Sequence, residues 1–190
     1  MTTVRERKDV TAVPMTTANK LTLLRVLLIP VFLVIVYLQF PGYQYWALGV
    51  YIAACLTDTL DGYIARHYHQ VSDFGKFCDP LADKCLVTAA LCWFVEEGLF
   101  FGWILVVVLL REFAVTGLRM IAAEKGRVIA AGWSGKIKTA STMVCICLII
   151  FGISRVFNLI CQGIILATTL YSGVEYFVKN WDVFRENQEV

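Results

Sequence analysis

The chain has 190 residues, of which 58% are hydrophobic and only 17% are charged, and its mean hydropathy is +0.68. Because roughly half is the usual apolar share of a soluble globular domain, a water-soluble chain of this length could not bury so much apolar surface. The formal net charge of +2 is too small to indicate a nucleic-acid partner. The apolar residues gather in long runs, which is typical of membrane-spanning helices.

Six apolar segments are each near the length of about 20 residues that a helix needs to cross a bilayer core. They cover residues 21–40, 44–65, 74–95, 99–122, 136–154 and 158–178. A polar arm, residues 1–18, precedes them, and no linker or internal repeat divides residues 19–190. The sequence therefore predicts an all-α polytopic membrane protein in which residues 19–190 form one transmembrane domain with six transmembrane helices.

Lysine and arginine are distributed unevenly between the two ends of these segments. They gather before the first segment, between the second and third, between the fourth and fifth, and after the sixth: Arg5, Arg7, Lys8, Lys20, Arg66, Lys76, Lys125, Arg127, Lys136, Lys138, Lys179 and Arg185. Among the other three connections, only the last carries a basic residue, Arg155. Because short cytoplasmic loops are enriched in Lys and Arg, this pattern predicts that both termini, including the arm 1–18, are cytoplasmic.

Four aspartates lie at the predicted cytoplasmic ends of the second and third segments. Asp58 and Asp61 are three residues apart, and Asp79 and Asp83 are four apart, so each pair shares one face of a helix. A short turn joins the two segments, so both acidic faces can meet at one membrane depth. Four neighbouring carboxylates repel each other, and Mg²⁺ or Mn²⁺ would relieve that repulsion with oxygen ligands.

Small and basic residues are interleaved with these aspartates. The order is Asp58-x-x-Asp61-Gly62-x-x-Ala65-Arg66, then eight residues, then Gly75-x-x-x-Asp79-x-x-x-Asp83. Small side chains at Gly62, Ala65 and Gly75 would let a flat ligand approach the backbone, and the planar guanidinium of Arg66 suits a phosphate. Taken alone, the aspartates could also line the cation path of a transporter or channel, or could be interfacial charges at helix ends.

This pattern resembles the signature of the CDP-alcohol phosphotransferase family, with every defining residue present between residues 58 and 83. The resemblance implies a six-helix membrane fold, usually a homodimer, with a cytoplasm-facing site for two metal ions. It implies that Asp58, Asp61 and Asp79 bind metal, and that Asp83 is both a metal ligand and the candidate catalytic base. The residues implied to bind CDP-diacylglycerol are Asn19, Thr22, Asp58, Asp61, Gly62, Ala65, Arg66 and Gly75.

Other segments are similar to bacterial members of this family whose acceptor is sn-glycerol 3-phosphate. They are NKLTLLR at 19–25, DPLADK at 79–84, REFAVTGLR at 111–119 and GKIKT at 135–139. This similarity implies an enzyme of the bacterial plasma membrane, with its active site on the cytoplasmic side, that transfers a phosphatidyl group from CDP-diacylglycerol to glycerol 3-phosphate. Inositol phosphate or phosphatidylglycerol is the alternative acceptor within the family.

Basic residues in the fourth and fifth segments are candidates for binding the acceptor phosphate. Arg111 and Arg119 are eight residues apart and lie close to one helix face. Arg111 lies within an apolar run, so it needs an anionic partner, either a substrate phosphate or a carboxylate such as Glu112. Lys136 is the third candidate, because it follows Gly135 in a segment that matches the family. Lys138 could instead be only a cytoplasmic charge at the start of a helix.

Overall fold

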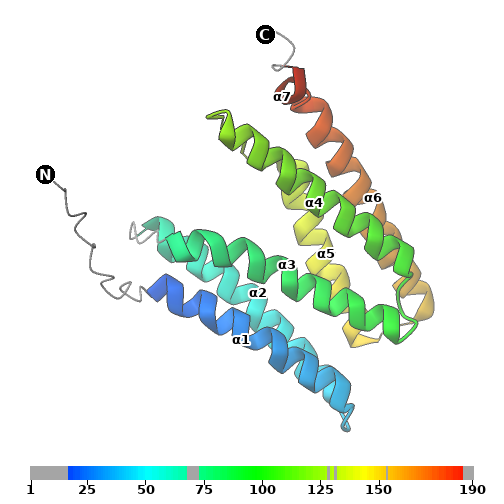
Figure 1. Cartoon of the computed structure of the whole chain (residues 1–190). Helices are drawn as coiled ribbons and strands as arrows, with labels where there is room; N and C mark the ends of the chain where they lie inside the picture. Colours follow the sequence, from blue (N-terminus) through cyan, green and yellow to red (C-terminus); the bar gives the residue numbers. More distant parts are fainter. Residues whose placement is uncertain (1–16, 68–72, 128, 131, 153, 186–190) are drawn as a thin grey trace, which may run out of the picture.

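The computed structural model describes residues 17–67, 73–127, 129–130, 132–152 and 154–185, and the side chains of all these except 17–20, 58–67, 73–80 and 184–185. Within this part the chain forms helices and no strand, so the all-α prediction is confirmed. The helices are α1 (Thr17–Leu38), α2 (Tyr43–His67), α3 (Asp73–Glu96), α4 (Gly102–Glu124), α5 (Trp133–Phe151), α6 (Arg155–Lys179) and the short α7 (Asp182–Arg185) (Figure 1). Of the predicted arm, residues 1–16 lie outside the described residues.

Each of the helices α1 to α6 coincides with one predicted apolar segment. Three stretches within them are long and apolar enough to cross a membrane: Leu21–Leu38, Trp133–Phe151 and Arg155–Lys179. The other three long helices carry charged residues along their length, namely the aspartates of α2 and α3 and the arginines and Glu112 of α4. The number of six spans therefore stays a prediction, while the three apolar helices agree with the predicted helical membrane fold.

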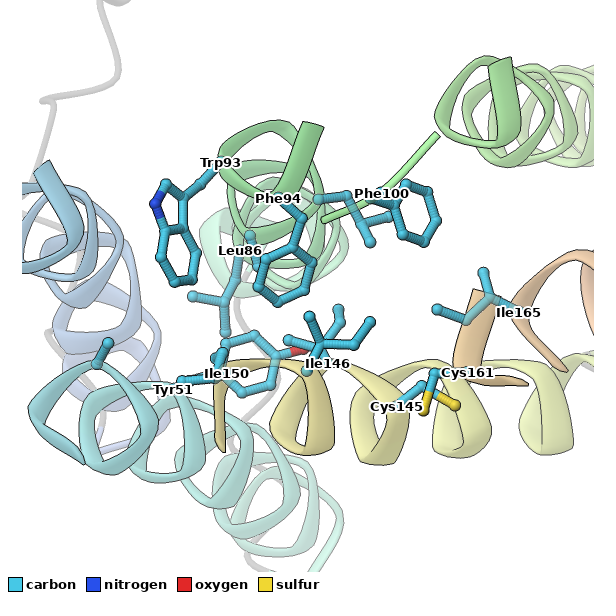
Figure 2. Packing of buried hydrophobic residues seen from close by; sticks show 14 of the residues in the cluster. Tyr51, Leu86, Trp93, Phe94, Phe100, Cys145, Ile146, Ile150, Cys161 and Ile165 are labelled. Atoms are coloured by element: carbon cyan, nitrogen blue, oxygen red, sulfur yellow. The ribbon is translucent and has the colours of Figure 1, made fainter. Parts of the chain in front are cut away.

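The main core contains residues of all six long helices, most of them from α1, α2, α3 and α5. Phe32 of α1 packs against Tyr51 of α2 and Trp93 of α3, with ring centroids 6.1 Å and 6.2 Å apart. Figure 2 shows Tyr51, Leu86 and Phe94 meeting Ile146 and Ile150 of α5. All of these side chains are buried, so α1, α2, α3 and α5 form one packed body.

A smaller core joins α4, α6 and α7. It contains Val115, Leu118, Ala122, Tyr176 and Val183. Beyond the membrane-spanning helices, Arg127 Nη2 lies 2.7 Å from Asp182 Oδ2, and Lys125 Nζ donates a 2.7 Å hydrogen bond to the carbonyl oxygen of Val183. These contacts hold α7 against the end of α4.

The turn between α3 and α4 is fixed by polar residues of α6. The amide nitrogen of Gln162 donates to the carbonyl oxygen of Leu99 (3.1 Å), while its Oε1 accepts from the backbone N–H of Phe101 (3.0 Å). Gln162 is only 4% exposed, so a buried side chain anchors this turn, although Leu99 and Phe101 themselves are exposed. From it α3 and α4 diverge, as Figure 1 shows, and α5 lies behind the space between them.

Candidate active site

A cavity of about 580 Å³ lies between α3, α4 and α5. Part of its wall is charged and consists of Asp83 and Lys84 of α3, Glu112 of α4 and Lys138 of α5. Further along α3 and α4 its wall is mainly apolar: Val87, Ala89, Cys92, Val108 and Leu109. The cavity therefore joins an ionic region to an apolar one.

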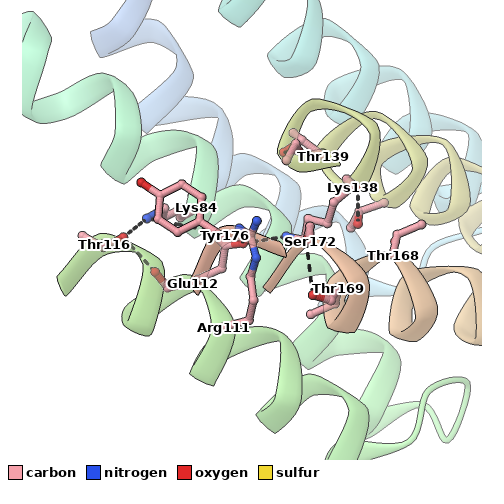
Figure 3. Close-up of polar contacts among 12 residues, drawn as sticks. Lys84, Arg111, Glu112, Thr116, Lys138, Thr139, Thr168, Thr169, Ser172 and Tyr176 are labelled. Atoms are coloured by element: carbon pink, nitrogen blue, oxygen red, sulfur yellow. Dashed lines mark hydrogen bonds and ion pairs between the residues drawn. The ribbon is translucent and has the colours of Figure 1, made fainter. Parts of the chain in front are cut away.

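The ionic region is organised around the carboxylate of Glu112. Its Oε1 accepts hydrogen bonds from Lys138 Nζ (2.8 Å) and Arg111 Nη1 (3.0 Å), and its Oε2 lies 3.8 Å from Lys84 Nζ. Lys84 Nζ also donates to Thr116 Oγ1 (2.6 Å), whose hydroxyl donates to the carbonyl oxygen of Glu112 (2.8 Å). Figure 3 shows how these side chains converge from α3, α4 and α5. We call Lys84, Arg111, Glu112 and Lys138 the Glu112 cluster.

Two glycines make room for the Arg111 side chain. A Cβ atom added at Gly173 of α6 would lie 3.2 Å from Arg111 Cγ, and one added at Gly135 of α5 would lie 3.7 Å from Arg111 Nη2. The Arg111 side chain is 13% exposed, so it runs between helices rather than into solvent. The anionic partner that the sequence required for Arg111 is Glu112, one of the two alternatives considered.

Two other predicted phosphate-binding residues lie apart from the Glu112 cluster. Arg119 Nε donates to the hydroxyl of Tyr176 (2.9 Å), and the guanidinium lies 5.4 Å from the centroid of that ring. Lys136 is exposed, with its Nζ 5.0 Å from the centroid of the Trp133 ring. The contacts that the structure shows for Arg119 and Lys136 therefore do not reach Glu112.

Sequence reasoning did not decide whether Lys138 binds the acceptor phosphate or is only a cytoplasmic charge. In the structure Lys138 is 5% exposed and lines the cavity. The signal that could have found it is helical spacing. Lys138, Thr142, Cys145 and Ile149 follow one another at intervals of three or four residues and are all buried, so they form one stripe facing the interior. Lys136 lies off that stripe. Lys84 was also missed, because its position after Asp83 gave no indication of its partner.

The four aspartates lie on the two helices that the sequence predicted. Asp58 and Asp61 belong to α2, and Asp79 and Asp83 belong to α3. Asp83 is partly buried on the cavity wall, whereas the side chains of the other three lie outside the described part. Among the described side chains no group of three or more acidic, His or Cys residues could hold a metal ion. The donor set of four carboxylates fits a divalent cation, and the metal site stays a prediction.

The predicted CDP-diacylglycerol site falls mostly outside the described side chains. Thr22 is described, and it is 1% exposed on α1. The others lie on α1, α2 and α3 as backbone positions only: Asn19, Gly62, Ala65, Arg66 and Gly75. Their roles remain those implied by the sequence.

The fold and the cavity together define an integral membrane protein that can bind a ligand with both an anionic group and an apolar part. The chain belongs to the CDP-alcohol phosphatidyltransferase family, whose family model matches residues 15–174. This finding confirms the family expected from residues 58–83.

Relatives from several bacteria are similar over most of their length. A CDP-diacylglycerol–glycerol-3-phosphate 3-phosphatidyltransferase of Bacillus subtilis (strain 168) is 38% identical over 185 residues, which cover 88% of this chain and 96% of the relative. A probable phosphatidylglycerophosphate synthase of Mycobacterium tuberculosis is 36% identical over 168 residues, 85% of this chain and 80% of the relative. A Pseudomonas fluorescens relative with the same name as the Bacillus protein is 35% identical over 178 residues, 86% of this chain and 89% of the relative.

Proposed function

We propose that this chain transfers the phosphatidyl group from CDP-diacylglycerol to sn-glycerol 3-phosphate, giving phosphatidylglycerophosphate and CMP. The names of the Bacillus and Pseudomonas relatives give this donor and acceptor, and the name of the Mycobacterium relative gives this product. The structural observation that carries the proposal is the cavity, in which Asp83, Lys84, Glu112 and Lys138 adjoin an apolar wall. A lipid donor needs the apolar wall, and a phosphorylated acceptor needs the cations.

In the proposed reaction Asp83 accepts the proton of the free primary hydroxyl of glycerol 3-phosphate. The hydroxyl oxygen forms a bond to the phosphorus that carries diacylglycerol, and the bond from that phosphorus to the CMP oxygen breaks. The position of Asp83 on the cavity wall supports this role, because a general base must lie within hydrogen-bond reach of the proton it takes.

We propose that Asp58, Asp61, Asp79 and Asp83 hold two divalent ions, Mg²⁺ or Mn²⁺. Such ions offset the negative charge that develops on a leaving phosphate. Asn19, Thr22, Gly62, Ala65, Arg66 and Gly75 would complete the CDP-diacylglycerol site together with Asp58 and Asp61. Arg111, Arg119 and Lys136 are the proposed acceptor contacts, and the burial of Lys138 in the cavity adds this residue to them.

We further propose that the protein lies in the bacterial plasma membrane with both termini and the active site facing the cytoplasm. The alternation of basic residues between successive connections supports this orientation. A homodimer is the assembly that the family resemblance implies, and cross-linking of the protein in membranes tests it.

The test of the reaction is CMP release by detergent-purified protein supplied with CDP-diacylglycerol and Mg²⁺. Glycerol 3-phosphate, inositol phosphate and phosphatidylglycerol are offered in separate reactions. We expect release with glycerol 3-phosphate and none above background with the others. Preference for another acceptor would contradict the acceptor assignment, and no release with any acceptor would contradict the transferase function.

A further inference from the structure

We propose that Glu112 is a positioning residue of this enzyme, which holds Lys84, Arg111 and Lys138 in the arrangement that binds the phosphate of the acceptor. This inference rests on the proposed function, because it assigns a role within the same acceptor site.

The geometry makes Glu112 the common partner of three cations that come from three different helices. Lys138 of α5 and Arg111 of α4 share Oε1, at 2.8 Å and 3.0 Å, while Lys84 of α3 lies 3.8 Å from Oε2. The Glu112 side chain is 20% exposed and the Lys138 side chain 6%, so water screens these charges only partly. Without the carboxylate the three cations would repel one another and move apart.

The cations keep donors that Glu112 does not use. An ammonium group has three N–H donors and a guanidinium has five, whereas the hydrogen bonds above occupy one donor of Lys138 and one of Arg111. Arg111 Nε is buried and has no hydrogen-bond partner in the described part of the chain. Lys84 and Lys138 line the cavity, so their remaining donors can receive an additional anion without releasing Glu112.

The location of the cluster selects which anion this is. Lys84, Glu112 and Lys138 line the same cavity as Asp83, the proposed base. A small phosphorylated alcohol held by these cations would therefore have its free hydroxyl within the compartment that Asp83 borders. The phosphate of glycerol 3-phosphate is the group that this arrangement fits.

The experiment compares Glu112→Gln, which removes the charge but keeps the size, with Glu112→Asp, which keeps the charge. Full-length protein in detergent is assayed for kcat and KM with each substrate. We expect Glu112→Gln to raise the KM for glycerol 3-phosphate at least about tenfold, with kcat and the KM for CDP-diacylglycerol changed less than about threefold. Glu112→Asp is expected to recover part of the loss.

Two further variants separate positioning from general stabilisation. Gln162→Leu removes buried hydrogen bonds at the far end of the cavity helices, so it should lower the melting temperature without a selective change in KM. Because Glu112 acts partly through Lys138, the rise in KM in the double variant Glu112→Gln/Lys138→Met should be smaller than the product of the rises in the two single variants. The glycerol 3-phosphate concentration that half-saturates the thermal shift should also rise in Glu112→Gln.

Several outcomes would overturn the inference. An unchanged KM for glycerol 3-phosphate in Glu112→Gln would do so. Equal rises in the KM for both substrates in Glu112→Gln, together with a melting temperature as low as that of Gln162→Leu, would also do so, because they would indicate general destabilisation. If Glu112→Gln does not fold, a raised KM for glycerol 3-phosphate in Glu112→Asp that multiplies fully with the rise in Lys138→Met, when the two are combined, would overturn it. Wild-type protein that releases no CMP with glycerol 3-phosphate would instead contradict the proposed function.

Discussion

Asp83 is the one aspartate of the predicted metal and base set whose side chain is described, and it lies on the wall of the cavity. Replacing it with Asn keeps the shape but removes the basic oxygen. We expect Asp83→Asn to lower the rate of CMP release by at least about 10²-fold, while CDP-diacylglycerol binding is largely kept. Equilibrium binding of the lipid and single-turnover CMP release measure the two effects, and near-normal turnover would exclude Asp83 as the base.

Gly173 offers a test of how Arg111 is placed. Because an added Cβ would lie 3.2 Å from Arg111 Cγ, Gly173→Ala should displace this side chain. We expect the KM for glycerol 3-phosphate to rise about threefold or more, with little change for the lipid. Gly163 of the same helix is the matched control, since nothing lies within 4 Å of a Cβ added there. Equal effects of Gly163→Ala and Gly173→Ala would indicate a general loss of helix packing.

Lys136 and Lys138 differ in environment although they are two residues apart. Lys138 is buried against Glu112, whereas Lys136 is exposed beside Trp133. If both bind the acceptor phosphate, Lys136→Met and Lys138→Met should each raise the KM for glycerol 3-phosphate, and the buried site should show the larger rise, about tenfold. A selective effect of Lys136→Met alone would return the acceptor site to the arrangement first expected from the sequence.

At the scale of the element, the ends of the helices were harder to predict than their existence. Hydropathy placed the fourth helix from residue 99, but it begins at Gly102, because the carbonyl oxygen of Phe94 accepts hydrogen bonds from Leu99 and Phe100 and holds a turn there. The fifth was expected from residue 136 and begins at Trp133, since its first turn is polar enough to escape a hydropathy window. α7 was not predicted, because a helix of four residues is too short to show a periodic pattern of apolar side chains.

The contacts of α7 with the end of α4 can be tested one at a time. The Arg127 guanidinium lowers the pKa of the Asp182 carboxyl through their hydrogen bond. A lowered pKa means that this contribution is fully present above the ordinary Asp pKa of about 4 and is lost only as the pH falls through the lowered value. The ion pair is thus constant at neutral pH, and both partners are exposed, so its contribution is small.

Val183 is the stronger contact, because it is 1% exposed within the smaller core. We expect Val183→Asp to accelerate trypsin cleavage after Lys179 at least about tenfold at neutral pH, and Asp182→Asn less than about threefold. Measuring both variants against wild-type protein at pH 7 and pH 8 should give the same ratios. A larger effect of Asp182→Asn would mean that the ion pair, and not the core, holds α7.

At the scale of the whole molecule, the sequence predicted the order and length of the six long helices and the helices that carry the aspartates. Apolar runs and i, i+3 or i, i+4 spacing are local properties, so one chain is sufficient to read them. The Glu112 cluster is not local, since Glu112 is 28 residues from Lys84 and 26 from Lys138 in the chain. Which cation meets the carboxylate depends on how α3, α4 and α5 pack, and the sequence does not encode that by spacing.

The anchored turn between α3 and α4 has a consequence for how this enzyme must be assayed. The helices diverge from that turn, and the wall of the cavity between them includes Leu81 and Phe113, which are 51% and 71% exposed. We expect a lipid to reach Asp83 sideways from the bilayer, without passing through water. The donor concentration that governs the rate is therefore the mole fraction of CDP-diacylglycerol in the membrane or micelle. Adding inert detergent lowers this mole fraction even when the bulk concentration of CDP-diacylglycerol is constant, so it should slow the reaction as effectively as removing substrate.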